Sequence, residues 1–141
     1  MAASSKIRGL AERVAARSLG VTVDEVRSVL DSDETSQLIG FSGFDIWTLV
    51  AAIMQVLMDQ IGNCPARKST FDAIRNPGLF ARVHMRRRAV KVFDEMPEVV
   101  WQGRGAAVAR IIEEEAAKQT DEELAAMFVE AKNPPLDLML I

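Results

Sequence analysis

The chain has 141 residues, of which 49% are hydrophobic and 6% aromatic, and its formal net charge is −3. A chain of this length buries about two thirds of its extended surface, so we expect one domain with a substantial core. The single cysteine, Cys64, excludes an intramolecular disulfide and a multi-cysteine metal site.

Charge is distributed unevenly along the chain. Residues 67–91 carry eight Lys/Arg against one Asp/Glu, whereas residues 92–141 carry four against eleven. The basic segment can bind an external polyanion, or it can face acidic residues inside the fold or across a subunit contact. Residues 1–14 lack the apolar core of a secretion signal, so we expect a cytoplasmic protein or one inside an intracellularly assembled particle.

Residues 1–34 are expected to form a helical hairpin. A first helix is predicted over about residues 5–18, because apolar residues recur there at helical spacing. A second helix begins after Thr22, which can form a capping box with Glu25, and ends near Asp31.

This hairpin resembles a helix-turn-helix. Small Ala16 is followed four residues later by Gly20 in the turn. Apolar residues occupy the positions that such a motif requires, namely Ala15, Leu19, Val21, Val26 and Val29. A second helix that reads DNA must present hydrogen-bond donors, but Asp24, Glu25 and Asp31 present negative charge, which phosphates repel. An ordinary helical hairpin is therefore favoured over a DNA-reading one.

Residues 41–63 are the most apolar part of the chain and predict a central helix over about residues 43–61. Ser42 and Asp45 can form a variant of the capping box, and Gly62 is expected to end the helix in a left-handed conformation. The uncharged run inside this helix is too short to span a membrane. The predicted fold class is an all-α, single-domain multi-helix bundle around this helix.

The central helix carries one polar stripe on an otherwise apolar surface. Asp45, Thr48, Gln55 and Asp59 recur at steps of three and four residues. The rest of the surface must be covered by the same chain or by another subunit, and the first is favoured. In an assembly, the contact would include Trp47, Val50, Met54 and Leu57.

Residues 67–96 form a basic helical segment, with a helix predicted over about residues 77–95. Five cations of this helix are candidate contacts for a polyanion or an acidic partner: Arg82, Arg86, Arg87, Arg88 and Lys91. The last three lie on a solvated arc, whereas the first two fall between two apolar clusters.

Arg82 and Arg86 therefore need a partner or must extend their charged ends to solvent. Pairing with Asp45, Asp59 or an acidic C-terminal residue is the favoured interpretation. The alternative is that Arg82 and Arg86 help the other three cations to hold phosphates or an acidic surface.

Residues 97–133 form an acidic helical segment. Gly103 and Gly105 are expected to mark a turn between two helical pieces, because no strand precedes them and no phosphate-loop lysine follows. A helix is predicted over about residues 106–119, with its three consecutive glutamates, 113–115, largely outward. Thr120 and Glu123 can then form another capping box, which opens a helix ending near Lys132.

Residues 134–141 form an apolar tail. Its assembly candidates are Leu136, Leu138, Met139, Leu140 and Ile141. Such a tail is expected to dock in its own core or on a neighbouring subunit.

Catalytic patterns are lacking. His84 lies beside arginines, Cys64 has no assured base, and no zinc spacing, phosphate loop or nucleophile elbow occurs. We therefore expect no enzyme, cofactor, metal site or small-molecule substrate.

These features favour a non-enzymatic helical assembly or adaptor protein that self-associates as a homo-oligomer or within a larger assembly. A structural component of a particle such as a virion is compatible with them. The basic helix would contact an acidic protein surface or nucleic acid. The alternative is a DNA-binding regulator that uses the hairpin or the basic helix, and a membrane-surface role ranks third because the acidic remainder opposes anionic lipid.

Overall fold

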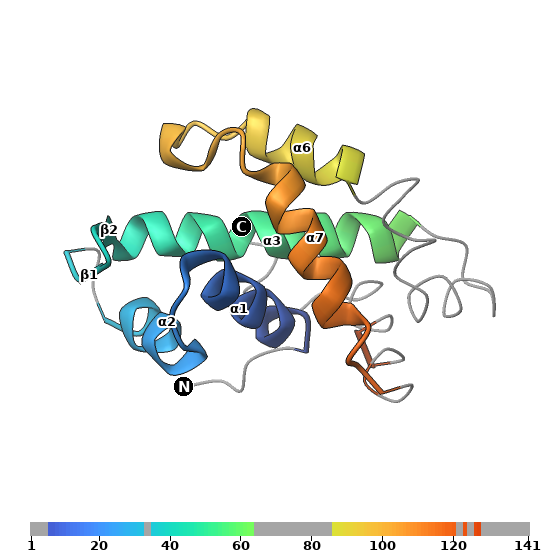
Figure 1. The fold of residues 1–141 in the computed structure, drawn as a ribbon, viewed down its shortest axis with the longest axis horizontal. Coiled ribbons are helices and arrows are strands. Elements are labelled where there is room, and N and C mark those ends of the chain that lie inside the picture. The colour runs from blue at the N-terminus through green and yellow to red at the C-terminus, as the bar shows by residue number, and fades with distance from the viewer. Residues whose placement is uncertain (1–5, 33–34, 64–85, 121–122, 124–125, 128–141) are drawn as a thin grey trace.

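The computed structural model describes residues 6–32, 35–63, 86–120, 123, 126 and 127, and this part of the chain is a small all-α fold, as predicted (Figure 1). The α-helices are α1 (Lys6–Leu19), α2 (Val23–Leu30), α3 (Gly43–Asn63), α6 (Arg86–Asp94) and α7 (Gly105–Ala116). A short 3-10 helix, η2 (Val99–Trp101), connects α6 to α7.

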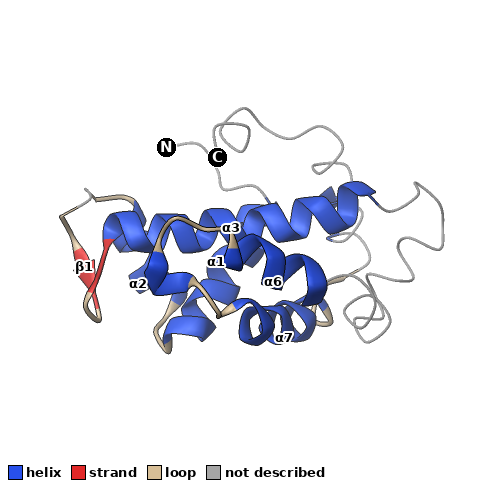
Figure 2. Ribbon diagram, turned by 90° about the horizontal axis from the view of Figure 1, so that it is seen from above, coloured by secondary structure: helices blue, strands red, loops and turns tan. Residues whose placement is uncertain are grey.

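The central position predicted for α3 is confirmed. This helix packs against α1, α2 and α6, while α7 packs against α1 and α6. In Figure 1, α6 and the α1–α2 hairpin lie on opposite sides of the line of α3. Figure 2 shows α3 along one side of the described part and α7 along the opposite side, so that α1 and α6 lie between them.

One continuous apolar core joins these helices. Its largest fully buried side chains are Trp101, Phe93, Ile7, Leu10, Ile46, Leu49, Ile53, Met54 and Ile112. Each such side chain contributes about 1.5–3 kcal/mol when it leaves water. Because the set comes from α1, α3, α6, η2 and α7, the core fixes these elements relative to one another.

The α1–α2 hairpin forms as predicted. The Glu25 amide donates to Thr22 Oγ1 at 3.1 Å, and the Thr22 amide donates to Glu25 Oε1 at 3.3 Å, which completes the capping box. Gly20 has φ of +73°, a conformation that favours glycine. The apolar positions of the helix-turn-helix resemblance all belong to the core or pack against it.

A two-stranded antiparallel sheet, β1 (Gln37–Leu38) and β2 (Phe41–Ser42), precedes α3. Ile39 and Gly40 connect the strands, and both have positive φ values, 45° and 88°. This hairpin was not predicted, because strands of two residues are too short to show an alternating pattern.

Both ends of α3 can be compared with the sequence. At its start, the Asp45 amide donates to Ser42 Oγ at 3.2 Å and the Ser42 amide to Asp45 Oδ2 at 3.1 Å, which confirms the capping box. The predicted end was wrong, because α3 continues through Gly62 to Asn63. Glycine inside a helix lowers stability by only about 1 kcal/mol relative to alanine, so Gly62 does not have to end the helix. Proline disfavours a helical conformation in the residue before it, and Asn63 lies before the residue that Pro65 restricts.

The turn predicted at Gly103 and Gly105 is confirmed. Gly103 has φ of +82°, and α7 begins at Gly105. A Cβ atom on Gly105 would lie 2.6 Å from the Ala89 carbonyl oxygen and 2.6 Å from Val90 Cα. Glycine at this position therefore lets α7 approach the backbone of α6 closely.

The capping box predicted at Thr120 and Glu123 also forms. The Thr120 amide donates to Glu123 Oε1 at 2.9 Å, and the Glu123 amide donates to Thr120 Oγ1 at 3.1 Å. Most of the helix predicted to follow it lies outside the described residues.

Candidate interaction surfaces

The helix α6 carries an exposed group of cations. Its buried side chains, Ala89, Val92 and Phe93, belong to the core, whereas Arg86, Arg87 and Lys91 are exposed to solvent. No carboxylate in the described part of the chain lies within ion-pair distance of these three side chains. Arg82 and the beginning of the predicted helix lie outside the described residues. We call Arg86, Arg87 and Lys91 the α6 cations.

Arg88 differs from its neighbours on α6. Its Nε atom lies 3.8 Å from Asp59 Oδ2 of α3, and each side chain keeps 34% of its surface exposed. The sequence placed Arg88 on the solvated arc, which was wrong, and it favoured Arg82 and Arg86 for such a pairing. Among the described residues, Arg86 pairs with neither Asp45 nor Asp59. Arg88 meets Asp59 because α6 packs on α3, and Val92, one turn further along α6, lines the groove together with side chains of α3.

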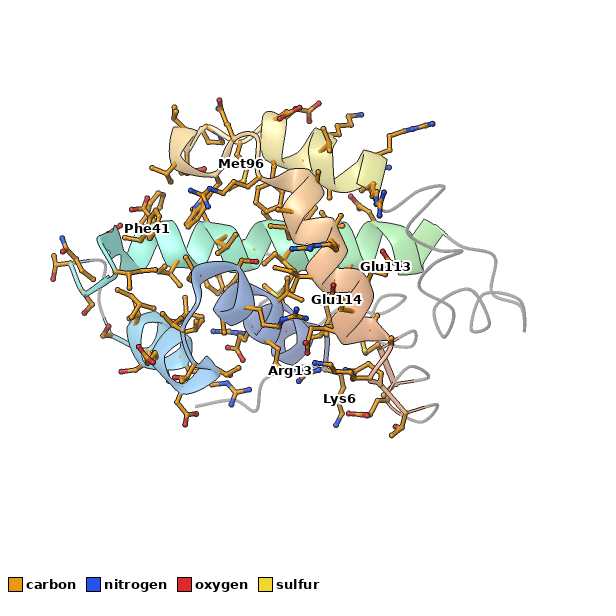
Figure 3. All side chains as sticks on the ribbon, viewed as in Figure 1. Lys6, Arg13, Phe41, Met96, Glu113 and Glu114 are labelled. Atoms are coloured by element: carbon orange, nitrogen blue, oxygen red, sulfur yellow. The ribbon has the colours of Figure 1, made fainter. Side chains whose placement is uncertain are left out.

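Ion pairs join α1 to α7 in what we call the α1–α7 seam. Arg17 Nη1 donates to Glu115 Oε2 at 3.0 Å, while its Nη2 donates to Glu114. Arg13 Nε lies 3.6 Å from Glu115 Oε1, and Lys118 Nζ lies 2.9 Å from Glu115 Oε2. Figure 3 labels Arg13 on α1 and Glu114 on α7, the two helices that these ion pairs join.

The side chain of Glu115 is only 6% exposed, which contradicts the outward orientation predicted for all three glutamates. Its environment gives the physical reason: three cations surround its carboxylate and satisfy its charge, so burial is tolerated. Two of these cations come from α1, far away in the sequence. The helical pattern of α7 alone carries no information about them.

A second buried carboxylate joins α1 to α2. Glu12, whose side chain is 2% exposed, accepts a hydrogen bond from Arg27 Nε at 2.8 Å and lies 3.5 Å from Arg8 Nε. The guanidinium of Arg8 also lies 5.0 Å from the centroid of the Trp47 ring, within the range of a cation–π contact. Sequence reasoning missed Glu12, although its spacing of four residues from Arg8 was a usable signal.

The ion pairs of the seam lower the pKa values of its two glutamates, Glu114 and Glu115. The hydrogen bond from Arg17 lowers the pKa of Glu114 below its ordinary value. Burial tends to raise the pKa of Glu115, but hydrogen bonds from Lys118 and Arg17 outweigh it, so that this pKa is lowered too. The backbone amide and the hydroxyl of Thr120 lower the pKa of Glu123. These carboxylates are therefore held in their charged form in the folded protein.

A groove of about 430 Å³ lies between α3 and the residues that follow α6. Its floor consists of side chains on α3, which are Phe44, Trp47, Thr48, Ala51, Ala52 and Gln55. Its wall is formed by Val92 and residues 95–98. In Figure 3, the wall residue Met96 lies beside α3, on the same side as α6. Part of the polar stripe, including Thr48 and Gln55, thus faces this groove.

The wall is tied to the floor by hydrogen bonds. The indole N–H of Trp101 donates to the Asp45 carbonyl oxygen at 2.8 Å and to Thr48 Oγ1 at 3.1 Å. The side-chain amide of Gln102 donates to the Met96 carbonyl oxygen at 2.6 Å. These bonds connect the segment that follows the wall to α3 and to the wall residue Met96.

The assembly residues predicted on α3 lie mostly inside the chain. Val50, Met54 and Leu57 are 0%, 1% and 2% exposed, so they form the core of this chain and a partner cannot reach them. Trp47 alone of the four keeps part of its surface accessible, and it does so in the groove. The predicted tail contacts, residues 136–141, lie outside the described residues.

The outer face of the hairpin is acidic. Asp24, Glu25 and Asp31 are exposed on and beside α2, and Arg27 is occupied by the buried Glu12. The second helix of the helix-turn-helix resemblance therefore presents a surface that repels phosphates.

No protein-family model, curated protein or solved structure matches this chain. Among the described helices, none combines the length and apolarity needed to cross a membrane. Within the same residues, His, Cys, Asp and Glu side chains form no group of three that could hold a metal ion. His84 and Cys64 lie outside the described residues.

Proposed function

We propose that this chain is a non-enzymatic assembly or adaptor protein that docks on an acidic surface through the α6 cations. One observation carries the proposal. The α6 cations are exposed and have no carboxylate partner in the described part of the chain, whereas each arginine of α1 and α2 takes part in an ion pair. A group of exposed cations that meets no carboxylate among the described residues is suited to bind a negatively charged partner.

A second copy of the chain supplies such a surface. Asp24, Glu25 and Asp31 form an exposed acidic face on the hairpin, separate from α6. Contact between this face and the α6 cations of a neighbour would join two different patches, so it would build rings or open assemblies. This arrangement supports self-association as the form of assembly.

Nucleic acid is the second candidate partner, because the same cations can contact phosphates. Two features make it less favoured than a protein surface. The chain carries a net charge of −3, and the outer face of the hairpin is acidic. A DNA-binding regulator that reads bases with α2 is less favoured still, since the exposed residues there offer mostly acceptors.

Sedimentation velocity over a concentration series tests the proposal. We expect self-association at high micromolar concentration that weakens as salt is added, because screening reduces contacts between exposed charges. Arg87→Glu is expected to weaken association about tenfold or more, since it places a like charge against the acidic face. Arg110→Glu is the matched control, because Arg110 is an exposed cation on α7, and it should leave association unchanged.

Duplex DNA added at low salt separates the two candidates. DNA binding that Arg87→Glu abolishes, without self-association of the protein alone, would favour the nucleic-acid function. A strict monomer that binds no DNA would contradict both.

A further inference from the structure

The groove between α3 and residues 95–98 has the dimensions and the lining of a helix-binding site. Floor residues from Phe44 to Gln55 recur at helical steps along about 16 Å of α3, which corresponds to three helical turns. At the centre of the floor, Ala51 and Ala52 leave room for a side chain from outside. A volume of about 430 Å³ accommodates two or three large apolar side chains.

Apolar surface at the groove is accessible. Phe44 on the floor is 45% exposed, and the residues that follow the wall, Val99 and Val100, are 75% and 44% exposed. Buried apolar anchors contribute most of the affinity when a helix binds in a groove. Since the Trp101 hydrogen bonds hold the segment that follows the wall against α3, little ordering is required before a partner binds.

The charge at the rim selects the partner. Glu95 and Glu98 line the wall, and among the residues that the structure describes no Lys or Arg lines the groove. We propose that this groove binds an amphipathic helix of a partner protein that presents two or three apolar anchors flanked by Lys or Arg. This site is distinct from the α6 cations and does not depend on the function proposed above.

The tail of this chain is a poorer match for the groove. Residues 136–141 contain apolar side chains, but their only charged side chain is Asp137, which the glutamates at the rim would repel. Charge complementarity therefore favours the basic helix of a partner protein. It disfavours the tail, whether the tail comes from the same chain or from a second copy.

Nuclear magnetic resonance on the full chain tests this inference, because its two tryptophans act as probe and reference. Trp47 lines the groove and Trp101 is buried behind it. The ligand is a synthetic 14-residue helical peptide with leucine on one face and lysine on the other. We expect this peptide to shift the indole signal of Trp47 more than that of Trp101, which is buried and whose N–H donates to Thr48 on the floor of the groove. A peptide with glutamate in place of lysine should bind at least about tenfold more weakly.

Three variants locate the binding. Phe44→Ala removes an exposed apolar contact, and the double variant Glu95→Lys, Glu98→Lys reverses the charge of the rim, so each should weaken binding of the lysine peptide about tenfold. Asp94→Lys is the matched control, because Asp94 is exposed beside the groove but does not line it. It should bind the peptide as tightly as the unmodified chain does.

Several results would overturn the inference. The groove is not the site if the lysine peptide leaves Trp47 unchanged or if the rim variant binds as well as the Asp94 variant. Equal binding of the glutamate peptide would remove the charge selection. A Trp47 shift on deletion of residues 134–141, before any peptide is added, would identify the tail as the occupant.

Discussion

The cations of α1 and those of α6 have opposite environments. Arg13 and Arg17 lie against the acidic helix α7, where a buried glutamate and an exposed one receive them. Arg87 and Lys91 lie on the outer side of α6 and meet no carboxylate in the described part of the fold. The number of cations on a helix therefore does not distinguish structural arginines from those available to a partner. The carboxylates on the neighbouring helix make that distinction.

This comparison also shows which helix pairs with the glutamates of the acidic C-terminal segment. The helix α7 packs against both α1 and α6, yet Glu114 and Glu115 are paired with α1. The most basic part of the sequence, residues 67–91, was one of two possible counterparts of the acidic segment, the other being a partner outside the fold. Within the described residues of that part, Arg88 alone forms an ion pair, and its partner Asp59 belongs to α3.

The largest expected effect concerns the seating of α6 on α7. Gly105→Ala should lower the free energy of unfolding by about 2–3 kcal/mol, because the new Cβ would overlap backbone atoms of α6 that cannot easily move. Urea denaturation measures this change. Ala107→Ser, on an exposed position of the same helix, should change the free energy by less than about 0.5 kcal/mol. Equal stability of the two variants would contradict the close approach.

The next largest effect tests whether the ion pairs of Glu115 in the α1–α7 seam stabilise the fold. Glu115→Gln should lower the free energy of unfolding by about 2 kcal/mol, since it leaves three cations without their shared charged partner. Glu113→Gln removes the same charge two residues away, outside the seam, and should cost less than about 0.5 kcal/mol. Thermal and urea unfolding of both variants decide the matter. A similar loss of unfolding free energy in both variants would mean that removing any negative charge from α7 has this effect, and that the ion pairs of the seam are not its cause.

A smaller effect is the pH dependence of the seam. The pKa of Glu115 is lower in the folded protein than its ordinary value of 4.5, so its stabilising contribution is complete above that pH. The contribution is lost as pH falls through the folded pKa, because protonation breaks the ion pairs. Melting temperatures from pH 7 to pH 3 should therefore converge for the unmodified chain and Glu115→Gln. A constant difference across this range would show that the charge of Glu115 is not the cause.

The smallest effect belongs to the α6 cations. Arg87→Ala should change the free energy of unfolding by less than about 0.5 kcal/mol, because this side chain is exposed and meets no described carboxylate. Calorimetry at low and high salt would measure it. A loss comparable to that of Glu115→Gln would make Arg87 a structural residue and weaken the proposed function.

Local sequence signals predicted most of the described fold. The capping boxes at Thr22 and Ser42 mark real helix starts, and the one at Thr120 forms its expected hydrogen bonds, because a cap depends on residues only three positions apart. The turn at Gly103 was likewise predictable from local sequence. Helical spacing alone also placed Arg87 and Lys91 on an exposed arc. It placed Arg88 there too, and it assigned Arg86 to a position between two apolar clusters.

What could not be predicted depends on contacts between distant segments. Glu12 and Glu115 have the polar character of surface residues, and only the arginines of other helices explain their burial. The groove has a similar origin, since its wall comes from residues 95–98 and its floor from α3. Phe44 and Trp47 gave a partial signal, being large side chains near the polar stripe, but helical periodicity does not reveal the segment opposite them.

The α1–α7 seam also has a consequence for the order in which the chain folds. Arg17 and Glu115 are 98 residues apart in sequence, so the partner of the first helix is synthesised long after that helix has left the ribosome. Contacts of such long range close slowly, because much of the intervening chain must be arranged first. Arg13 and Arg17 are therefore expected to remain open to other acidic molecules during synthesis and to pair with α7 only in a late step.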